Sequence, residues 1–386
     1  MPKVTVVIPS YNHGCFLAAR LDSVLAQTYR DFEVLFLDDA STDDSLEVFA
    51  RYRDRPQVRA IVNEVNGGGV FRQWNRGVGE ARGEYVWLAE SDDVADPAFL
   101  ETLVPLLDRH PNAGLAYCKS LHIDEDGRVT GDTDDWTRPV HPTRWSGDHV
   151  NGGPDECRRY LCRRNTIPNA SAVVFRKRLY DQAGYADEDM RLCGDWAMWV
   201  KMLLASDVAY VARPLNLWRV AHAASVRREA SGSMGCLEAH LTILGRIVAA
   251  GPLPPEMIPV VAEDCVWGWQ HHADRDPEAE NPLTHSRCAR LAAELGPAFQ
   301  AALVAAVMGH AVHSRRRLEG LERRVAGLER QAEELALWRR LHRLLVPENG
   351  WRRRVAPCPP PALRPGVPCR RPDSRWPAAS GHRYAA

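Results

Sequence analysis

The sequence VVIPSYNHG, residues 6–14, joins a run of β-branched residues to a short polar loop. The apolar run predicts a buried strand, and residues 15–29 follow with the spacing of a helix. A strand that ends in small and polar residues before a helix is how α/β folds build ligand sites at the carboxyl ends of parallel strands. An ordinary turn between a strand and a helix is the alternative interpretation.

The same alternation of strand and helix patterns continues to about residue 120. It predicts an α/β fold, with a mostly parallel, Rossmann-like sheet covered by helices and right-handed crossovers. The further strands are expected at 32–40, 58–64, 84–90 and 114–124, and the further helices at 42–52, 69–81 and 97–110. A loop-like segment at 131–153 interrupts the pattern, which resumes over 171–220 as part of the same domain.

Composition and charge indicate what kind of protein this is but identify no partner. The chain has 386 residues and a formal net charge of −1, so its charge points to no polyanion, and nucleic acid is not an expected partner. The ten cysteines include no CxxC pair, which predicts reduced, structural thiols rather than a zinc site. Neither a signal peptide nor a long uncharged apolar stretch is recognisable, and we therefore expect a cytoplasmic protein.

Four regions are predicted along the chain. An α/β domain is expected at 1–232 and a helical extension at 233–313. They are followed by a short coiled coil at 314–345 and a disordered tail rich in Arg and Pro at 346–386. The apolar heptad positions of the coiled coil are Leu318, Leu321, Val325, Leu328, Ala332 and Leu335. Three heptads serve equally for a homo-oligomer and for an intramolecular partner, and both remain open.

The basic tail permits two interpretations. Its Arg and Pro residues suit a linker that touches acidic lipid, which would place the protein at the inner face of a membrane. The same composition is also that of an out-of-frame reading of a GC-rich gene. The helical region has no basic amphipathic face clear enough to decide for peripheral membrane contact.

Two acidic clusters follow predicted strands. Asp38 and Asp39 end one strand, and the segment 90–93, ESDD, ends another. Because parallel strands end at one edge of a sheet, these carboxylates should converge there and repel each other unless a cation or a ligand offsets their charge. Each cluster alone is equally suited to cap the helix that follows it.

The order and spacing of three segments make a family resemblance specific. The segments VVIPSYN, LDDASTDDS and NRGVGEARGEYVWLAESDD together resemble the start of a family-2 glycosyltransferase with the GT-A fold. The resemblance covers about residues 3–226. It implies a nucleotide-sugar donor, a glycan or lipid-linked acceptor, and a divalent metal, Mg²⁺ or Mn²⁺.

The resemblance also assigns roles to residues of this edge. It implies that Asp39 bonds the nucleotide base while Pro9 and Tyr11 pack beside it, and that Asp92 lies near the ribose. Asp93 is the implied metal ligand, which agrees with the preference of hard cations for oxygen. Many relatives have Asp at the position of Glu90, so Glu90 is at most a secondary ligand here.

The catalytic base is implied by the segment ADEDMRLCGDWAMWVKML, residues 186–203. Relatives carry an acidic pair there, of which this chain keeps the second acid, Asp195, and replaces the first by Gly194. A carboxylate at the start of a helix could take the proton of an acceptor hydroxyl, although it could also merely cap that helix. The neighbouring acids at 187–189 are expected to be loop residues.

Further along, LWRVAHAASVR resembles the segment that closes over the diphosphate in relatives. It implies that Arg219 neutralises phosphate oxygens and that His222 contacts the metal or a phosphate; a surface histidine is the alternative for His222. Trp136 and Trp145 fall in the variable region where relatives build the acceptor pocket. Aromatic faces suit sugar rings but do not identify the sugar.

The resemblance implies inverting transfer of a hexosyl or deoxyhexosyl unit from a nucleotide sugar to a hydroxyl of a glycan or glycolipid. The expected process is the synthesis of a cell-surface polysaccharide. A nucleotidylyltransferase is disfavoured, because the loop PSYNHG lacks the glycine run and basic residue that such an enzyme needs. A non-catalytic protein that binds a sugar nucleotide, or a scaffold, is the remaining alternative, and the departures at Glu90 and Gly194 keep it open.

Overall fold

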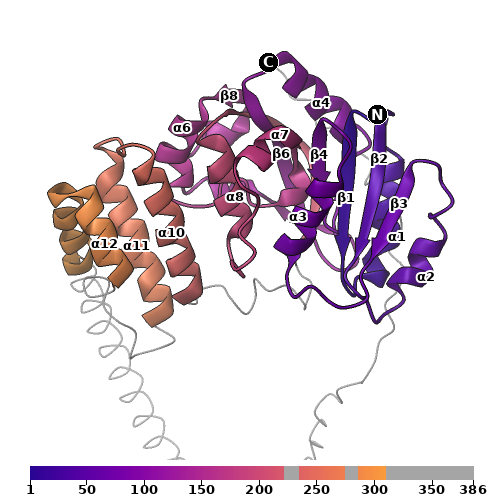
Figure 1. Ribbon diagram of the computed structural model, residues 1–386. Helices are drawn as coiled ribbons and strands as arrows, with labels where there is room; N and C mark the ends of the chain where they lie inside the picture. Colours follow the sequence, from indigo (N-terminus) through magenta and orange to yellow (C-terminus); the bar gives the residue numbers. More distant parts are fainter. Residues whose placement is uncertain (221–233, 274–285, 310–386) are drawn as a thin grey trace, which may run out of the picture.

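A computed structural model describes residues 1–220, 234–273 and 286–309. The predicted coiled coil and tail, and His222, lie outside these residues. Within them, one large sheet with helices on both faces is extended at one side by the helices α10, α11 and α12 (Figure 1).

The strands of the sheet follow the sequence pattern closely. They are β1 (Val4–Ser10), β2 (Phe32–Asp38), β3 (Val58–Val62), β4 (Tyr85–Leu88), β5 (Val94–Ala95), β6 (Ala113–Ile123), β7 (Val129–Asp132), β8 (His149–Asn151), β9 (Val173–Arg176) and β10 (Asp207–Arg219). The central order is β3-β2-β1-β4-β9-β6-β10-β5, with β7 beside β6 and β8 beside β10. β1, β2, β3 and β4 pair in parallel, as do β6 and β10, whereas β9 is antiparallel to both of its neighbours.

The helices connect and cover these strands. They are α1 (Gly14–Leu25), α2 (Ser45–Ala50), α3 (Val70–Glu80), α4 (Phe99–Arg109), α5 (Asp134–Thr137), α6 (Gly153–Glu156), α7 (Lys177–Gln182), α8 (Gly194–Leu203), α10 (Met234–Ala249), α11 (Met257–Ala273) and α12 (Ser286–Leu295). Short 3₁₀ turns occupy Arg144–Ser146 and Ala170–Ala172, and a π-helical turn occupies Cys157–Leu161. The segment expected to be loop at 131–153 therefore contains short regular elements.

The central strands are buried on both faces, which explains their continuous apolar sequence. Val6 and Ile8 of β1 pack in the cluster under α1 and α4, while Val7 packs in the cluster under α3 and α8. Successive strand residues point to opposite faces, so each face receives its own apolar layer.

The helical extension shares the core of the sheet domain. Apolar residues of α10, such as Leu241 and Leu244, belong to the same buried cluster as Trp199 of α8. His240 of α10 contacts the carbonyl oxygen of Cys162 through Nε2 at 2.9 Å. No helix in the described parts of the chain is both long and apolar enough to span a bilayer.

Candidate active site

Three loops meet where β1, β2 and β4 end. Because β1 pairs in parallel with β2 on one side and with β4 on the other, the carboxyl ends of all three lie at one edge of the sheet (Figure 1). Ser10 at the end of β1 is the register partner of Asp38 at the end of β2. The Nδ1 atom of His13 then lies 2.7 Å from Oγ of Ser91, which joins the first loop to the acidic cluster after β4.

The loop after β1 presents one aromatic ring. Tyr11 is 46% exposed, whereas Pro9 is buried within the strand. Asn12 has the left-handed backbone conformation, with φ 55°, and its Oδ1 accepts a hydrogen bond from the backbone of Thr42 at 2.7 Å. The loops after β1 and β2 are thereby tied together, and Tyr11 rather than Pro9 is placed to meet a ligand.

Asp39 is held rigidly by three donors. Its Oδ1 accepts hydrogen bonds from Nδ2 of Asn63 at 2.7 Å, from the backbone of Gly67 at 2.8 Å and from Nε2 of Gln73 at 2.7 Å. The residue is 4% exposed. No described residue donates to Oδ2, so the carboxylate retains an acceptor for a ligand.

The two aspartates of the acidic cluster differ in accessibility. Asp93 is 1% exposed; its Oδ1 accepts the backbone N–H of Arg219 at 2.8 Å, and its Oδ2 accepts Nδ2 of Asn169 at 2.9 Å. Oδ2 also lies 3.8 Å from Nη2 of Arg20. Asp92 is only partly buried. This arrangement favours Asp92 over the predicted Asp93 as the carboxylate that meets a cation.

The cluster carries a concentrated negative charge. Burial, and next the charge of Asp92, raises the pKa of Glu90 to about 8, and the same two causes raise the pKa of Asp93. Arg20 is the buried countercharge: it is fully enclosed, and its Nε donates to the carbonyl oxygen of Glu90 at 2.7 Å. A ligand that brings positive charge would relieve the remaining repulsion.

Glu90 has a structural reason to be longer than aspartate. Its Oε1 accepts the indole N–H of Trp74, on α3, at 2.7 Å. Trp74 is almost fully buried and meets the ring of Phe71 edge-on, with centroids 5.0 Å apart. The acidic cluster is therefore linked through two aromatic rings to the start of α8.

At that start, Gly194 and Asp195 form the first turn of α8. A Cβ on Gly194 would lie 2.3 Å from Cε2 of Phe71, so the phenyl ring leaves room only for glycine. Asp195 is partly exposed, and its Oδ2 accepts a hydrogen bond from Nδ2 of Asn165 at 2.8 Å. Asn165 therefore orients the predicted base, and packing against Phe71 accounts for glycine at position 194.

The segment 165–171 supports both halves of the site. Asn165 bonds Asp195, and four residues later Asn169 bonds Asp93. Both asparagines are less than one-tenth exposed. Sequence reasoning missed them, because nothing in the local pattern of this loop indicates partners that lie far along the chain.

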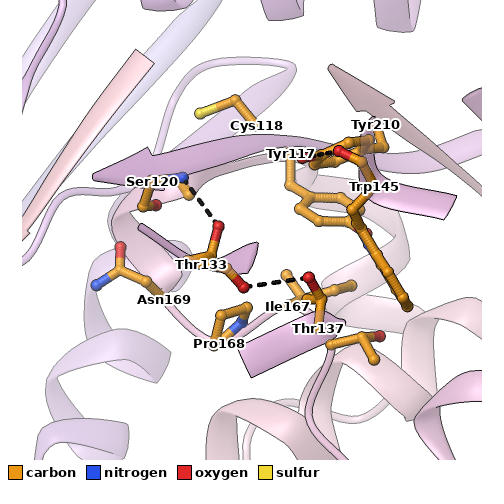
Figure 2. Close-up of a pocket in the computed structure, with 12 residues that line it drawn as sticks. Tyr117, Cys118, Ser120, Thr133, Thr137, Trp145, Ile167, Pro168, Asn169 and Tyr210 are labelled. Atoms are coloured by element: carbon orange, nitrogen blue, oxygen red, sulfur yellow. Dashed lines mark hydrogen bonds between the residues drawn. The ribbon is translucent and has the colours of Figure 1, made fainter. Parts of the chain in front are cut away.

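Residues of this segment line a small cavity (Figure 2). Its volume of about 10 Å³ corresponds to roughly one water molecule. The cavity is lined by Tyr117, Cys118, Ser120, Thr133, Thr137, Trp145, Thr166, Ile167, Pro168, Asn169, Ala172 and Tyr210. Trp145 is buried here and donates its indole N–H to the hydroxyl of Tyr117 at 2.8 Å, so it is a core residue and not an open sugar platform.

Arg219 is 3% exposed, and its guanidinium forms hydrogen bonds within the protein. Its Nε donates to the carbonyl oxygen of Asp92 at 2.9 Å, and its Nη1 donates to the carbonyl oxygens of Asp124 and Glu125. The guanidinium carbon lies 4.4 Å from the centre of the Phe16 ring. In this arrangement Arg219 positions the backbone of Asp92, and the predicted contact with a diphosphate would require it to leave these acceptors.

Among the described residues, no group of three or more His, Cys, Asp or Glu side chains is arranged to hold a metal ion. His222, the second predicted metal contact, lies outside them. The carboxylate chemistry at Asp92 suits Mg²⁺ or Mn²⁺, which commonly retain water and substrate phosphate as ligands. The residues present therefore fit a cation that is shared with a ligand rather than one caged by the protein.

The fold is that of a GT-A glycosyltransferase. A crystal structure of residues 1–349 of S. aureus TarS with UDP-GlcNAc matches 75% of this chain and 79% of that chain, with a TM-score of 0.53 and 17% identity. The sequence of residues 5–168 matches the model "Glycosyl transferase family 2". The match confirms the predicted resemblance to glycosyl transferase family 2 over residues 5–168.

Two relatives illustrate the extent of the similarity. The glycosyltransferase GlyG of Streptococcus pneumoniae is 34% identical over 100 residues, which are 26% of this chain and 33% of GlyG. The uncharacterized protein MT1568 of Mycobacterium tuberculosis is 28% identical over 263 residues, which are 67% of this chain and 79% of MT1568. The match to GlyG thus spans only a third of that protein's length.

Proposed function

We propose that this chain transfers a monosaccharide from a nucleotide sugar to a hydroxyl of a glycan or glycolipid, inverting the anomeric carbon, in the synthesis of a cell-surface polysaccharide. The observation that carries the proposal is the series of contacts from Glu90 through Trp74 and Phe71 to Gly194. These contacts connect the acidic cluster to the helix turn that carries Asp195, which supports a site where a donor and a base meet at one edge. The UDP-GlcNAc bound by TarS, which has a similar fold, supports a nucleotide-sugar donor.

The donor would lie across the ends of β1, β2 and β4. Oδ2 of Asp39 accepts an N–H of the nucleotide base, and the exposed ring of Tyr11 packs beside it, with Pro9 supporting the loop from within the strand. Asp92, with His222 as a predicted further ligand, would hold Mg²⁺ or Mn²⁺, which supplies positive charge to the diphosphate leaving group. Arg219, which is itself hydrogen-bonded to Asp93, donates to the carbonyl oxygen of Asp92 and so positions its backbone.

The acceptor hydroxyl would approach Asp195. As the hydroxyl oxygen attacks the anomeric carbon, the Asp195 carboxylate takes its proton, and the bond from the anomeric carbon to the diphosphate oxygen breaks. Asn165 donates to Asp195 and so keeps one carboxylate oxygen directed during the transfer. A single carboxylate is sufficient for this step.

A non-catalytic binding protein or scaffold is the competing function. Gly194 had kept it open, but the Phe71 ring gives this glycine a packing reason that is independent of activity. Self-association through 314–345, a cytoplasmic location and contact with the inner membrane face stay predictions.

The test is turnover by the purified full chain. UDP-, GDP-, dTDP- and CDP-sugars are incubated singly with Mn²⁺, and nucleoside diphosphate release is compared among the wild type, Asp195→Asn and Asp189→Asn. Asp189 is an exposed acid six residues before Asp195 and serves as the matched control. We expect release from one donor, with a loss of about 10²-fold or more in Asp195→Asn only. Binding of a diphosphate without turnover by any variant would favour the scaffold.

A further inference from the structure

Trp136, in the short helix α5, is an ordered tryptophan that is 43% exposed. Its indole N–H donates to the carbonyl oxygen of Asn165 at 2.7 Å. The guanidinium carbon of Arg164 lies 4.6 Å from the ring centre, and Nη1 of Arg164 donates to the carbonyl oxygen of Trp136 at 3.0 Å. The ring is therefore fixed in place, yet a large part of it remains open to solvent.

The position of this ring relative to the predicted base is set by one residue. Asn165 accepts the indole N–H of Trp136 through its backbone and donates to Asp195 through its side chain. Asn165 thus joins the indole to the predicted base, and an acceptor that spans the two would place a sugar ring on the open part of the indole and a hydroxyl at Asp195. Tryptophan faces are suited to the apolar C–H surface of a sugar ring.

Arg164 adds a charge to this position. It is partly buried, and burial lowers the pKa of its guanidinium. The charge of Asp264 also acts on Arg164, but that carboxylate is paired at 2.8 Å with the neighbouring Arg163, and Arg164 forms no ion pair of its own in the described part of the chain. A partly desolvated guanidinium of this kind can form charge-assisted hydrogen bonds with an oxyanion.

We propose that Trp136 and Arg164 form the acceptor subsite, and that the acceptor is a glycan with an acidic group close to its reacting hydroxyl. A sugar ring of the acceptor packs on the open part of the indole, and the acidic group pairs with Arg164. This proposal rests on the proposed function, because it takes Asp195 as the base. The acidic group is an oxyanion of either a uronic acid or a sugar phosphate.

Binding of small probes to the full chain tests the subsite without turnover. Methyl β-D-glucuronide, glucose 6-phosphate and neutral methyl β-D-glucoside are titrated separately and followed by saturation-transfer NMR. The variants are Trp136→Ala, Trp136→Phe and Arg164→Met. Trp267→Ala is the matched control, since Trp267 is 56% exposed on α11.

We expect at least one acidic probe to bind more tightly than the glucoside. Trp136→Ala should weaken this binding about tenfold, the scale of one ring contact, while Trp136→Phe and Trp267→Ala retain it. Arg164→Met should abolish the preference for acidic over neutral probes. Which acidic probe binds identifies carboxylate or phosphate as the source.

Three results would overturn the proposal: no acidic probe binds the wild type, Trp136→Ala binds as well as the wild type, or Arg164→Met keeps the acidic preference. Failure of the proposed function is distinguished by a separate measurement, the absence of nucleoside diphosphate release from every donor. Melting curves of all variants verify that each is folded.

Discussion

The phenyl ring of Phe71 fills the space beside Gly194. A Cβ at position 194 would lie 2.3 Å from Cε2 and 2.5 Å from Cζ of this ring, distances at which one of the two groups must move. Gly194 directly precedes Asp195 in the first turn of α8, so the ring limits which residue can stand beside the predicted base. The packing at position 194 therefore depends on an aromatic residue of α3.

This coupling predicts a non-additive pair of substitutions. Gly194→Ala should lower the melting temperature by overpacking, at a cost of about 1–3 kcal/mol, and Phe71→Ala should lower it by leaving a cavity. The double variant should lose less stability than the sum of the two single losses, because the new methyl group enters the vacated space. Urea unfolding of the four proteins measures the coupling; strict additivity would show that the two sites do not interact.

Asn165 is predicted to position the base. In Asn165→Ala, the carboxylate of Asp195 loses a hydrogen bond, and kcat should fall about tenfold while KM for the donor stays unchanged. Steady-state kinetics at varied donor concentration separates the two parameters. A raised donor KM with normal kcat would instead assign Asn165 to donor binding.

Asp39 is predicted to bind the nucleotide base. Asp39→Asn replaces a charged acceptor by an amide next to three donors, so the affinity for the nucleoside diphosphate of the donor should fall about tenfold or more. Asp31→Asn, an exposed acid just before β2, is the control at the opposite end of the same strand. Equal affinities in calorimetric titrations of both variants would remove Asp39 from the site.

Stability is predicted to depend on pH through His149. Burial, and next the charge of Arg144, lowers the pKa of His149 from 6.5 to about 4. Between these values the unfolded chain binds more protons at this position than the folded protein, so the free energy of unfolding falls as pH drops from 6.5 to 4. The variant His149→Asn should show a smaller fall. The free energy of unfolding is measured by urea titration at several pH values from 7 to 4, and an equal pH dependence in wild type and variant would contradict the prediction.

The sequence was sufficient to predict the strands whose ends form the candidate site. Strong apolar runs and the polar residues after them located the ends of β1, β2 and β4, because the period and length of a buried strand are local properties. The antiparallel insertion of β9 between β4 and β6 was not predictable in this way. The strands beside β9 are far from it in the sequence, so local patterns do not indicate this pairing.

Side-chain burial was the less predictable part of the site. Asp93 and Arg219 were expected to face a ligand, but each is enclosed by partners from distant segments. Arg20 was not predicted as a site residue, although it lies among the apolar, buried positions of α1. A charged residue at such a helix position indicates a buried ion pair and can be recognised from the sequence.

We propose that the edge formed by β1, β2 and β4 binds a sugar-nucleotide diphosphate together with a divalent cation at Asp92. Calorimetric titration of UDP, GDP, dTDP and CDP into the full chain, with Mn²⁺ and then with EDTA, tests it most directly, with Asp92→Asn alongside. We predict that one diphosphate binds with Mn²⁺, and that EDTA or Asp92→Asn weakens binding at least about tenfold. Binding of no diphosphate, or equal binding with and without the cation, would contradict the claim.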